Sequence, residues 1–183
     1  IRVELIARVT TAQVRLQVDV GFGDAITPEA GVVAFPPLLD FPAPRLRAYP
    51  RETVVAEKLE AMVHLGLANS RMKDFYDVAV LARDFDFDGP LLTRAIRATF
   101  ERRKTPLPTT TPAALTAAFA EDPMKKTQWS GFVRRAGLRD AGTLAETIAE
   151  VRAFVAAPLA AAANGASAPL SWRAGGAWLE RGP

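Results

Sequence analysis

The hydrophobic period of the sequence changes at Arg51, and this change constrains the fold more than any other feature. Before it, residues 1 to 9 and 13 to 20 are rich in β-branched residues, which is typical of strands. After it, apolar residues recur every three or four positions, which is typical of amphipathic helices. A chain of 183 residues with 49% hydrophobic residues can bury a core. The sequence therefore predicts an α+β fold, with strands first and a helical bundle after them.

The segment QVRLQVDV, residues 13 to 20, alternates polar and apolar residues, so that one face of the strand is apolar and Asp19 projects from the other. Gly21, Gly23 and Pro28 then end the strand. Five prolines between residues 32 and 50 favour an extended connection with a short edge strand over a helix. We expect a small mixed sheet in this part of the chain.

The rest of the chain is predicted to be mainly helical. The helical segments are expected at about 51 to 66, 71 to 83, 90 to 104, 112 to 120, 124 to 136 and 142 to 157. We divide the chain into remaining strands and loops of a core domain at 1–50, a helical domain at 51–157 and a loosely ordered tail at 158–183, which is rich in alanine and glycine.

Charge is distributed unevenly along the chain. Between Arg94 and Arg139 there are ten Lys and Arg residues and three acids, a net charge of +7, although the whole chain carries only +3. Such a segment can contact nucleic-acid phosphates, or it can be a set of solvated helix faces. There is no cysteine, which fits the cytoplasm, and no apolar run long enough to span a membrane.

Asp19 and Lys58 have chemistry that suits nucleotide binding. A carboxylate on the polar face of a strand, beside a glycine, is a suitable Mg²⁺ ligand, but it can equally accept hydrogen bonds from the following turn. Lys58 borders the apolar stripe of its helix, so its ammonium can reach into a cleft as a point charge for a triphosphate. It can also extend to solvent, with Glu57 and Glu60 as merely solubilising neighbours. From the residues alone both alternatives stay open.

The stretch RMKDFYD, residues 71 to 77, places Asp74 and Asp77 three positions apart on one face of a helix. Two carboxylates this close repel each other unless a cation, a metal ion or a substrate proton offsets their charge. Arg71 and Lys73 can do this locally, as the ion pairs of a surface helix. The other interpretation is that the two carboxylates belong to a catalytic site.

Several segments in one order resemble the AbiEii/AbiGii family of nucleotidyltransferases, the toxin components of type IV toxin–antitoxin and phage abortive-infection systems. They are LQVDVGFGDAITP, YPRETVVAEKLEAMVHLG, NSRMKDFYDV, AIRATFERRKTPLP and QWSGFVRR. The resemblance covers about Arg2 to Phe154. It implies that the first 50 residues are the C-terminal part of a nucleotidyltransferase-fold sheet, which the helical bundle follows.

The resemblance also implies roles for four residues. Asp19 matches a metal-binding and catalytic carboxylate of the family, and Lys58 matches a lysine expected near the nucleoside triphosphate. Asp74 and Asp77 match an Asp-x-x-Asp motif expected at the edge of the active site. The implied cofactor is Mg²⁺, the implied substrate is a nucleoside triphosphate with tRNA as an acceptor, and the implied partner is a cognate antitoxin.

One departure from the family pattern lies at the start of the sequence. The family's Gly-Gly/Ser motif and Asp-x-Asp pair do not precede Asp19 here. Because phosphoryl transfer depends on metal ions and positioning, we expect the chain to be an N-terminally truncated piece that is inactive alone. The alternative function is a non-catalytic module that binds a nucleotide, RNA or the antitoxin.

Overall fold

The computed structural model describes residues 1–180 of the protein. The helices are α1 (Arg51–Leu65), α2 (Met72–Asp84), α3 (Gly89–Arg103), α4 (Ala117–Glu121), α5 (Pro123–Ala136) and α6 (Leu144–Ala163), with the 3₁₀ turns η1 (Gly66–Ala68) and η2 (Ala113–Leu115). The strands are β1 (Arg2–Val9), β2 (Ala12–Asp19), β3 (Gly31–Ala34), β4 (Arg45–Ala48), β5 (Phe87–Asp88), β6 (Leu170–Trp172) and β7 (Trp178–Glu180). The predicted α+β class is confirmed.

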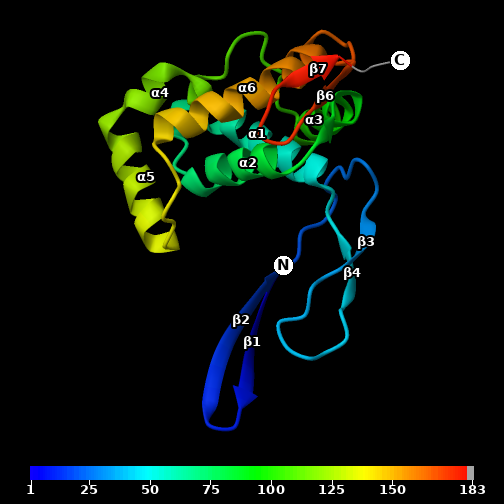
Figure 1. Ribbon diagram of the computed structural model, residues 1–183, viewed down its shortest axis with the longest axis vertical. Coiled ribbons are helices and arrows are strands. Elements are labelled where there is room, and N and C mark those ends of the chain that lie inside the picture. Colours follow the sequence, from blue (N-terminus) through cyan, green and yellow to red (C-terminus); the bar gives the residue numbers. More distant parts are fainter. Residues whose placement is uncertain (181–183) are drawn as a thin grey trace.

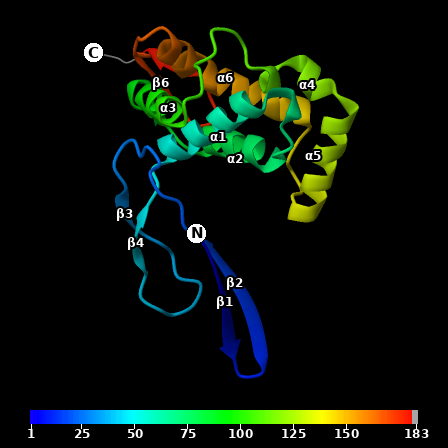
Figure 2. The same ribbon diagram turned by 180° about the vertical axis from the view of Figure 1, so that it is seen from behind.

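The first 50 residues form two separate antiparallel strand pairs, where the sequence predicted one mixed sheet. β1 pairs with β2, and β3 pairs with β4. Both pairs extend away from the helical body (Figures 1 and 2). The division of the chain into domains at residues 50 and 157 stays a prediction.

The alternation of residues gives the β1–β2 pair one apolar face. Val3 lies opposite Val18, and Leu5 lies opposite Leu16. Leu16 and Val18 are 47% and 48% exposed, and every residue of β2 is exposed. The expected apolar face is therefore present, but no other segment of residues 1–180 buries it.

A few polar contacts join the N-terminal segment to the helical body. Thr53 Oγ1, in the first turn of α1, accepts a hydrogen bond from Thr27 N and donates one to Thr27 O, each at 2.9 Å. Arg102, near the end of α3, donates a hydrogen bond to the backbone carbonyl of Gly23. These contacts hold the loop after β2 against α1 and α3.

The helices surround one hydrophobic core, and α1, α2, α3 and α6 contribute most of its completely buried side chains. Leu59, Met62, Phe75, Phe100 and Phe154 are each at most 1% exposed. Full burial of a side chain of this size stabilises the fold by about 1.5–3 kcal/mol. The packing of α1 against α2 in this core also positions the candidate site described below.

Four of the predicted helices are confirmed to within one or two residues: α1, α2, α3 and α5. The expected helix at 112 to 120 instead divides into η2 and α4. The division falls at Thr116, whose side chain accepts a hydrogen bond from Phe119 N and so caps α4. A side-chain cap at this position competes with a continuous helix.

The last predicted helix is longer than expected, because α6 continues through Pro158 to Ala163. A proline lacks the N–H group that would bond the carbonyl four residues earlier. Here that carbonyl belongs to Phe154, and it accepts a hydrogen bond from Trp178 Nε1 at 2.7 Å. The indole therefore replaces the missing donor, and the helix is not interrupted.

The expectation of a loosely ordered tail is wrong for residues 158–180. β6 pairs with β5 and β7 in a three-stranded antiparallel sheet that lies beside α6 (Figure 1). Trp172 is 5% exposed, and its Nε1 donates a hydrogen bond to Ala82 O at 2.7 Å. Its ring and that of Trp178 both pack against Phe154. The two tryptophans stabilise this segment, although many of its other residues are alanine or glycine. Residues 181–183 lie outside the described residues.

Within residues 1–180, no helix combines the length and the apolar composition that crossing a bilayer requires.

Candidate functional site

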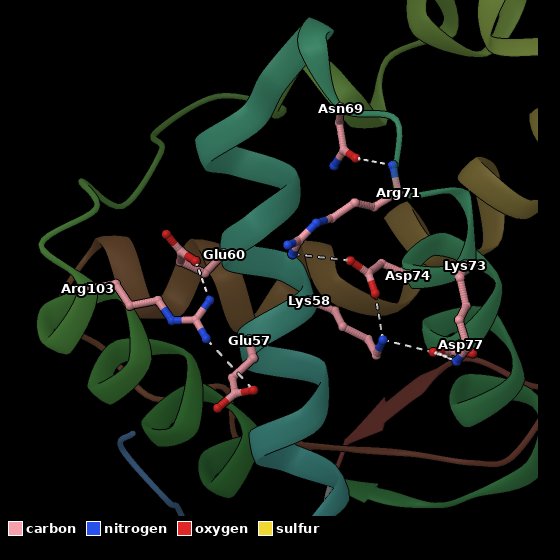
Figure 3. Close-up of polar contacts among 9 residues, drawn as sticks. All are labelled: Glu57, Lys58, Glu60, Asn69, Arg71, Lys73, Asp74, Asp77 and Arg103. Atoms are coloured by element: carbon pink, nitrogen blue, oxygen red, sulfur yellow. Dashed lines mark hydrogen bonds and ion pairs between the residues drawn. The ribbon is translucent and has the colours of Figure 1, made fainter. Parts of the chain in front are cut away.

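Lys58 connects α1 to α2 at the centre of the candidate site. Its Nζ donates a hydrogen bond to Asp74 Oδ1 at 2.6 Å and lies 2.8 Å from Asp77 Oδ2 (Figure 3). The structure therefore brings together three of the four residues that the sequence singled out. The two carboxylates share a cation that comes from a different helix.

Helix geometry explains why these side chains meet. Asp74 and Asp77 lie about one turn apart on α2, beside Phe75 and Val78, which are completely buried. Lys58 directly precedes Leu59, which is also completely buried in α1. The packing of the two apolar faces thus places the lysine against the carboxylates at the edge of the core.

The cluster is shielded from water without being sealed from it. The side chains of Lys58, Asp74 and Asp77 are 19%, 16% and 23% exposed. Burial acts to lower the pKa of Lys58, but its hydrogen bonds to Asp74 and Asp77 outweigh burial, and the pKa is raised above the usual 10.5. The lysine is therefore positively charged at neutral pH, and part of its side chain is exposed to solvent.

Local cations also pair with the two carboxylates, as the surface-helix interpretation expected. Lys73 Nζ lies 2.5 Å from Asp77 Oδ2, and Arg71 Nη1 lies 3.9 Å from Asp74 Oδ2. Both cations are well exposed, at 70% and 63%. Exposed ion pairs of this kind contribute little to stability. The better shielded Lys58 should therefore contribute more through its pairs with Asp74 and Asp77.

A second charged cluster lies on α1 next to Lys58, and sequence reasoning missed it (Figure 3). Glu60 is 5% exposed and accepts hydrogen bonds from Arg103 Nη1 at 2.7 Å and from Thr105 Oγ1. Glu57 lies 3.8 Å from Arg103, and burial raises the pKa of its carboxyl. The interpretation of these acids as solubilising residues is therefore wrong for Glu60. Their i, i+3 spacing was the signal for a shared basic partner.

Among residues 1–180, Asp19 makes no hydrogen bond or ion pair with Lys58, Asp74 or Asp77. It is at the end of β2, in the strand pair that extends away from α1 and α2 (Figures 1 and 2). Its Oδ1 accepts a hydrogen bond from Arg2 Nε at 2.8 Å, and its Oδ2 accepts one from Gln17 Nε2 at 2.9 Å. These bonds, Arg2 first, lower the pKa of Asp19. The polar face was predicted correctly, but the carboxylate pairs with side chains of its own strand pair.

The donor groups present do not by themselves form a Mg²⁺ site. Among residues 1–180, no three His, Asp or Glu side chains are grouped so that they could hold a metal ion. Both oxygens of Asp19 accept hydrogen bonds, and the carboxylates of Asp74 and Asp77 face an ammonium. Mg²⁺ requires several oxygen ligands in near-octahedral geometry.

The cluster nevertheless contains two kinds of group that phosphate chemistry uses. A lysine ammonium is a compact positive charge for phosphate oxygens. A carboxylate next to it can orient a hydroxyl group or accept its proton. The arrangement thus suits the binding of a phosphorylated ligand beside a proton acceptor.

Comparison with known proteins identifies the family. A scan of protein families matches residues 1–156 to the one described as nucleotidyl transferase AbiEii toxin, type IV TA system. A search of curated proteins and a search of solved structures each give no match. The matched span includes most of the chain and all four residues that the sequence singled out. The chain therefore belongs to the AbiEii nucleotidyl transferase toxin family of type IV toxin–antitoxin systems.

Proposed function

We propose that the chain forms part of a nucleotidyltransferase that moves a nucleotide from a nucleoside triphosphate to an acceptor. Family membership supports this class of reaction. One observation carries the assignment of the site, namely the Lys58 ammonium held 2.6 Å from Asp74 and 2.8 Å from Asp77. This geometry supports the assignment, because it sets an ammonium suited to phosphate beside two carboxylates suited to accepting a proton.

In the proposed reaction, a hydroxyl oxygen of the acceptor attacks the α-phosphorus of the triphosphate. A bond forms between these two atoms, the bond from the α-phosphorus to the bridging oxygen of the β-phosphate breaks, and pyrophosphate leaves. Lys58 binds oxygens of the triphosphate. When its ammonium turns from Asp74 or Asp77 to the phosphate, that carboxylate loses its most shielded partner and can accept the hydroxyl proton.

Asp19 is the residue that we assign to Mg²⁺, as a catalytic ligand. When bound, the ion would offset the negative charge of the triphosphate. Because the described residues do not gather further ligands around Asp19, none of the steps above depends on the ion. We further propose tRNA as the acceptor, the cognate antitoxin as a partner and the cytoplasm as the compartment.

Nucleotide binding tests the site directly. Each nucleoside triphosphate, with Mg²⁺, would be titrated into the wild-type chain and into Lys58→Met, Lys58→Arg and Lys73→Met. We expect at least one nucleotide to bind, Lys58→Met to weaken it about tenfold or more, and Lys73→Met to change it less than about twofold. Lys58→Arg keeps the charge and separates loss of charge from loss of folding. Equal affinity in wild type and Lys58→Met would contradict the assignment.

A second candidate function is a binding module without catalysis. The observation that favours it is that Asp19 pairs with Arg2 and Gln17, and not with the residues of the cluster. This module would bind a nucleotide or RNA but would not transfer a nucleotide labelled at its α-phosphate to tRNA. It would also keep its affinity in Asp19→Ala, whereas a metal-binding Asp19 predicts weaker binding of the Mg²⁺ complex.

A further inference from the structure

A groove with a strongly basic lining lies between the start of α2 and one face of α5. Its volume is about 730 Å³. Residues 70 to 74 form one wall, and the other wall comes from α5. The α5 residues form neighbouring pairs that recur every three or four positions and so share one broad face of the helix. They are Thr127, Gln128, Gly131, Phe132, Arg134 and Arg135. Asp74 lines the groove and also contacts Lys58, so the groove opens beside the candidate site.

The lining contains four cations and a single acid. The cations are Arg71, Lys73, Arg134 and Arg135, and the acid is Asp74. Asp74 already contacts Lys58, so it offsets little of the basic charge. Lys73 and Arg71 pair with Asp77 and Asp74, so the charge that an anionic ligand would offset is mainly that of Arg134 and Arg135.

Arg134 and Arg135 have no carboxylate partner among the described residues. Both lie in the last turn of α5, where positive charge is favourable to the helix dipole, so part of their role is structural. Gly131 leaves room for Arg135, because a Cβ at position 131 would lie 3.3 Å from Arg135 Nη1. The guanidinium of Arg135 therefore lies back along α5, over the groove wall.

Two further features indicate a polar ligand. Gln128, on the same wall, has a buried side-chain oxygen without a hydrogen-bond partner. The aromatic ring of Phe132 packs against Tyr76 and Trp129, so it supports the wall from within. The groove thus offers positive charges and hydrogen-bonding groups beside the part-buried ring of Phe132.

We infer that this groove binds the sugar–phosphate backbone of an RNA strand and directs one end of the strand to Lys58, Asp74 and Asp77. The inference rests on the proposed function, because it assigns the surface that holds the acceptor. The α5 wall from Thr127 to Arg135 is about 12 Å long at 1.5 Å per residue. At about 3.4 Å per nucleotide, it spans roughly three to four phosphates of a stacked strand. Contacts to phosphates alone make the binding insensitive to base sequence.

The test compares two double variants that remove the same charge. In the groove variant, Arg134→Gln is combined with Arg135→Gln. In the control variant, Arg94→Gln is combined with Arg139→Gln, two exposed cations of the same basic segment that do not line the groove. Affinity for a short single-stranded RNA would be measured at several salt concentrations. Thermal unfolding of both variants would show that each remains folded.

We expect the wild type to bind the RNA with an affinity that falls as salt rises. The groove variant should bind at least about tenfold more weakly, and its salt slope should fall by about 1.4, or 0.7 for each lost phosphate contact. The control variant should bind like the wild type. Equal losses in both variants, or no loss in either, would overturn the inference. Displacement of the RNA by polyglutamate at equal charge concentration would also overturn it, in favour of an acidic protein partner.

Nucleotide titration keeps this test separate from the test of the site. The groove variant should bind the Mg²⁺–nucleoside triphosphate as the wild type does, because Lys58 is unchanged. If no nucleotide binds the wild type but RNA binding still requires Arg134 and Arg135, the proposed reaction is contradicted and the inference about the groove stands. If nucleotide binding requires Lys58 but the groove variant binds RNA as tightly as the wild type, the proposed reaction stands and the inference about the groove is contradicted.

Discussion

Residues 1–50 and the helical body both follow clear hydrophobic patterns, but only the helical body buries them. In the β1–β2 pair, Leu16 and Val18 share one apolar face and remain about half exposed. In the helical body, Leu59 and Phe75 are completely buried, because α1, α2, α3 and α6 cover one another's apolar stripes. Periodicity alone thus indicates which face is apolar, and burial depends on a second surface to cover it. We expect the stability of the chain to reside almost entirely in the helical body.

The largest effect should come from an aromatic residue in the core. Phe75 is completely buried and its ring centroid lies 5.5 Å from that of Phe119, so Phe75→Ala should cost about 3–5 kcal/mol of unfolding free energy. Leu16→Ala, on the exposed face of β2, should cost less than about 0.5 kcal/mol. Urea unfolding measures both. Similar costs for the two variants would show that residues 1–50 bury a core after all.

The next largest effect should come from the ion pairs of the site. Lys58→Met leaves two shielded carboxylates without their shared cation and should cost about 2–3 kcal/mol, less than for a fully buried pair. Its control Lys73→Met removes an exposed cation and should cost less than about 0.5 kcal/mol. Arg2→Met, which frees the exposed Asp19 in the N-terminal segment, should leave the unfolding midpoint unchanged. The ranking would be contradicted if Lys73→Met cost as much as Lys58→Met.

A smaller effect should show that residues 170–180 belong with the helical body. Trp178→Phe removes the donor to Phe154 O and should cost about 1–2 kcal/mol, because that carbonyl loses its partner. In a Pro158→Ala background the cost should be smaller, since residue 158 then supplies its own N–H group. A double-mutant cycle by urea unfolding gives the coupling. If Trp178→Phe lowered the unfolding free energy equally in the two backgrounds, the indole would not be replacing the N–H group that Pro158 lacks.

The smallest effect should appear as a dependence on alkaline pH. The pKa of Lys58 is raised in the folded state, so its charge stabilises the fold fully below the unfolded value of 10.5. That contribution is lost as the pH rises through the higher folded-state pKa. The stability difference between wild type and Lys58→Met should be constant from pH 7 to about 10 and then shrink. A difference that stays constant up to pH 12, with both proteins folded, would contradict the raised pKa.

Local signals predicted most of the helices well. The stripe around Leu59, the one around Phe75 and the proline at the start of α3 are properties of neighbouring residues, and the structure places α1, α2 and α3 close to the expected bounds. The resemblance to a family grouped Lys58 with Asp74 and Asp77, and the packing of α1 on α2 brings them together. Each of these predictions depended only on the spacing of residues close in sequence or on the order of the family's motifs along the chain.

Predictions that depended on long-range contacts were less successful. The segment after Pro158 was expected to be loose, because the sequence does not reveal that Trp178 supplies the donor that the proline lacks. The grouping of Asp19 with Lys58 stays a prediction, because Asp19 lies in a strand pair whose placement against α1 no local pattern determines. The partnership of Glu60 with Arg103 spans 43 residues, and its only local trace was the spacing of Glu57 and Glu60.

The central claim, that Lys58 belongs to a nucleotide site, is tested most directly by chemical labelling of lysine amines. The wild-type chain would be labelled with an amine reagent, with and without a nucleoside triphosphate and Mg²⁺, and each lysine would be quantified by mass spectrometry. We expect the nucleotide to slow the labelling of Lys58 and to leave that of Lys104, an exposed lysine at the end of α3, unchanged. Labelling of Lys58 at the same rate with and without every nucleotide tested would contradict the claim.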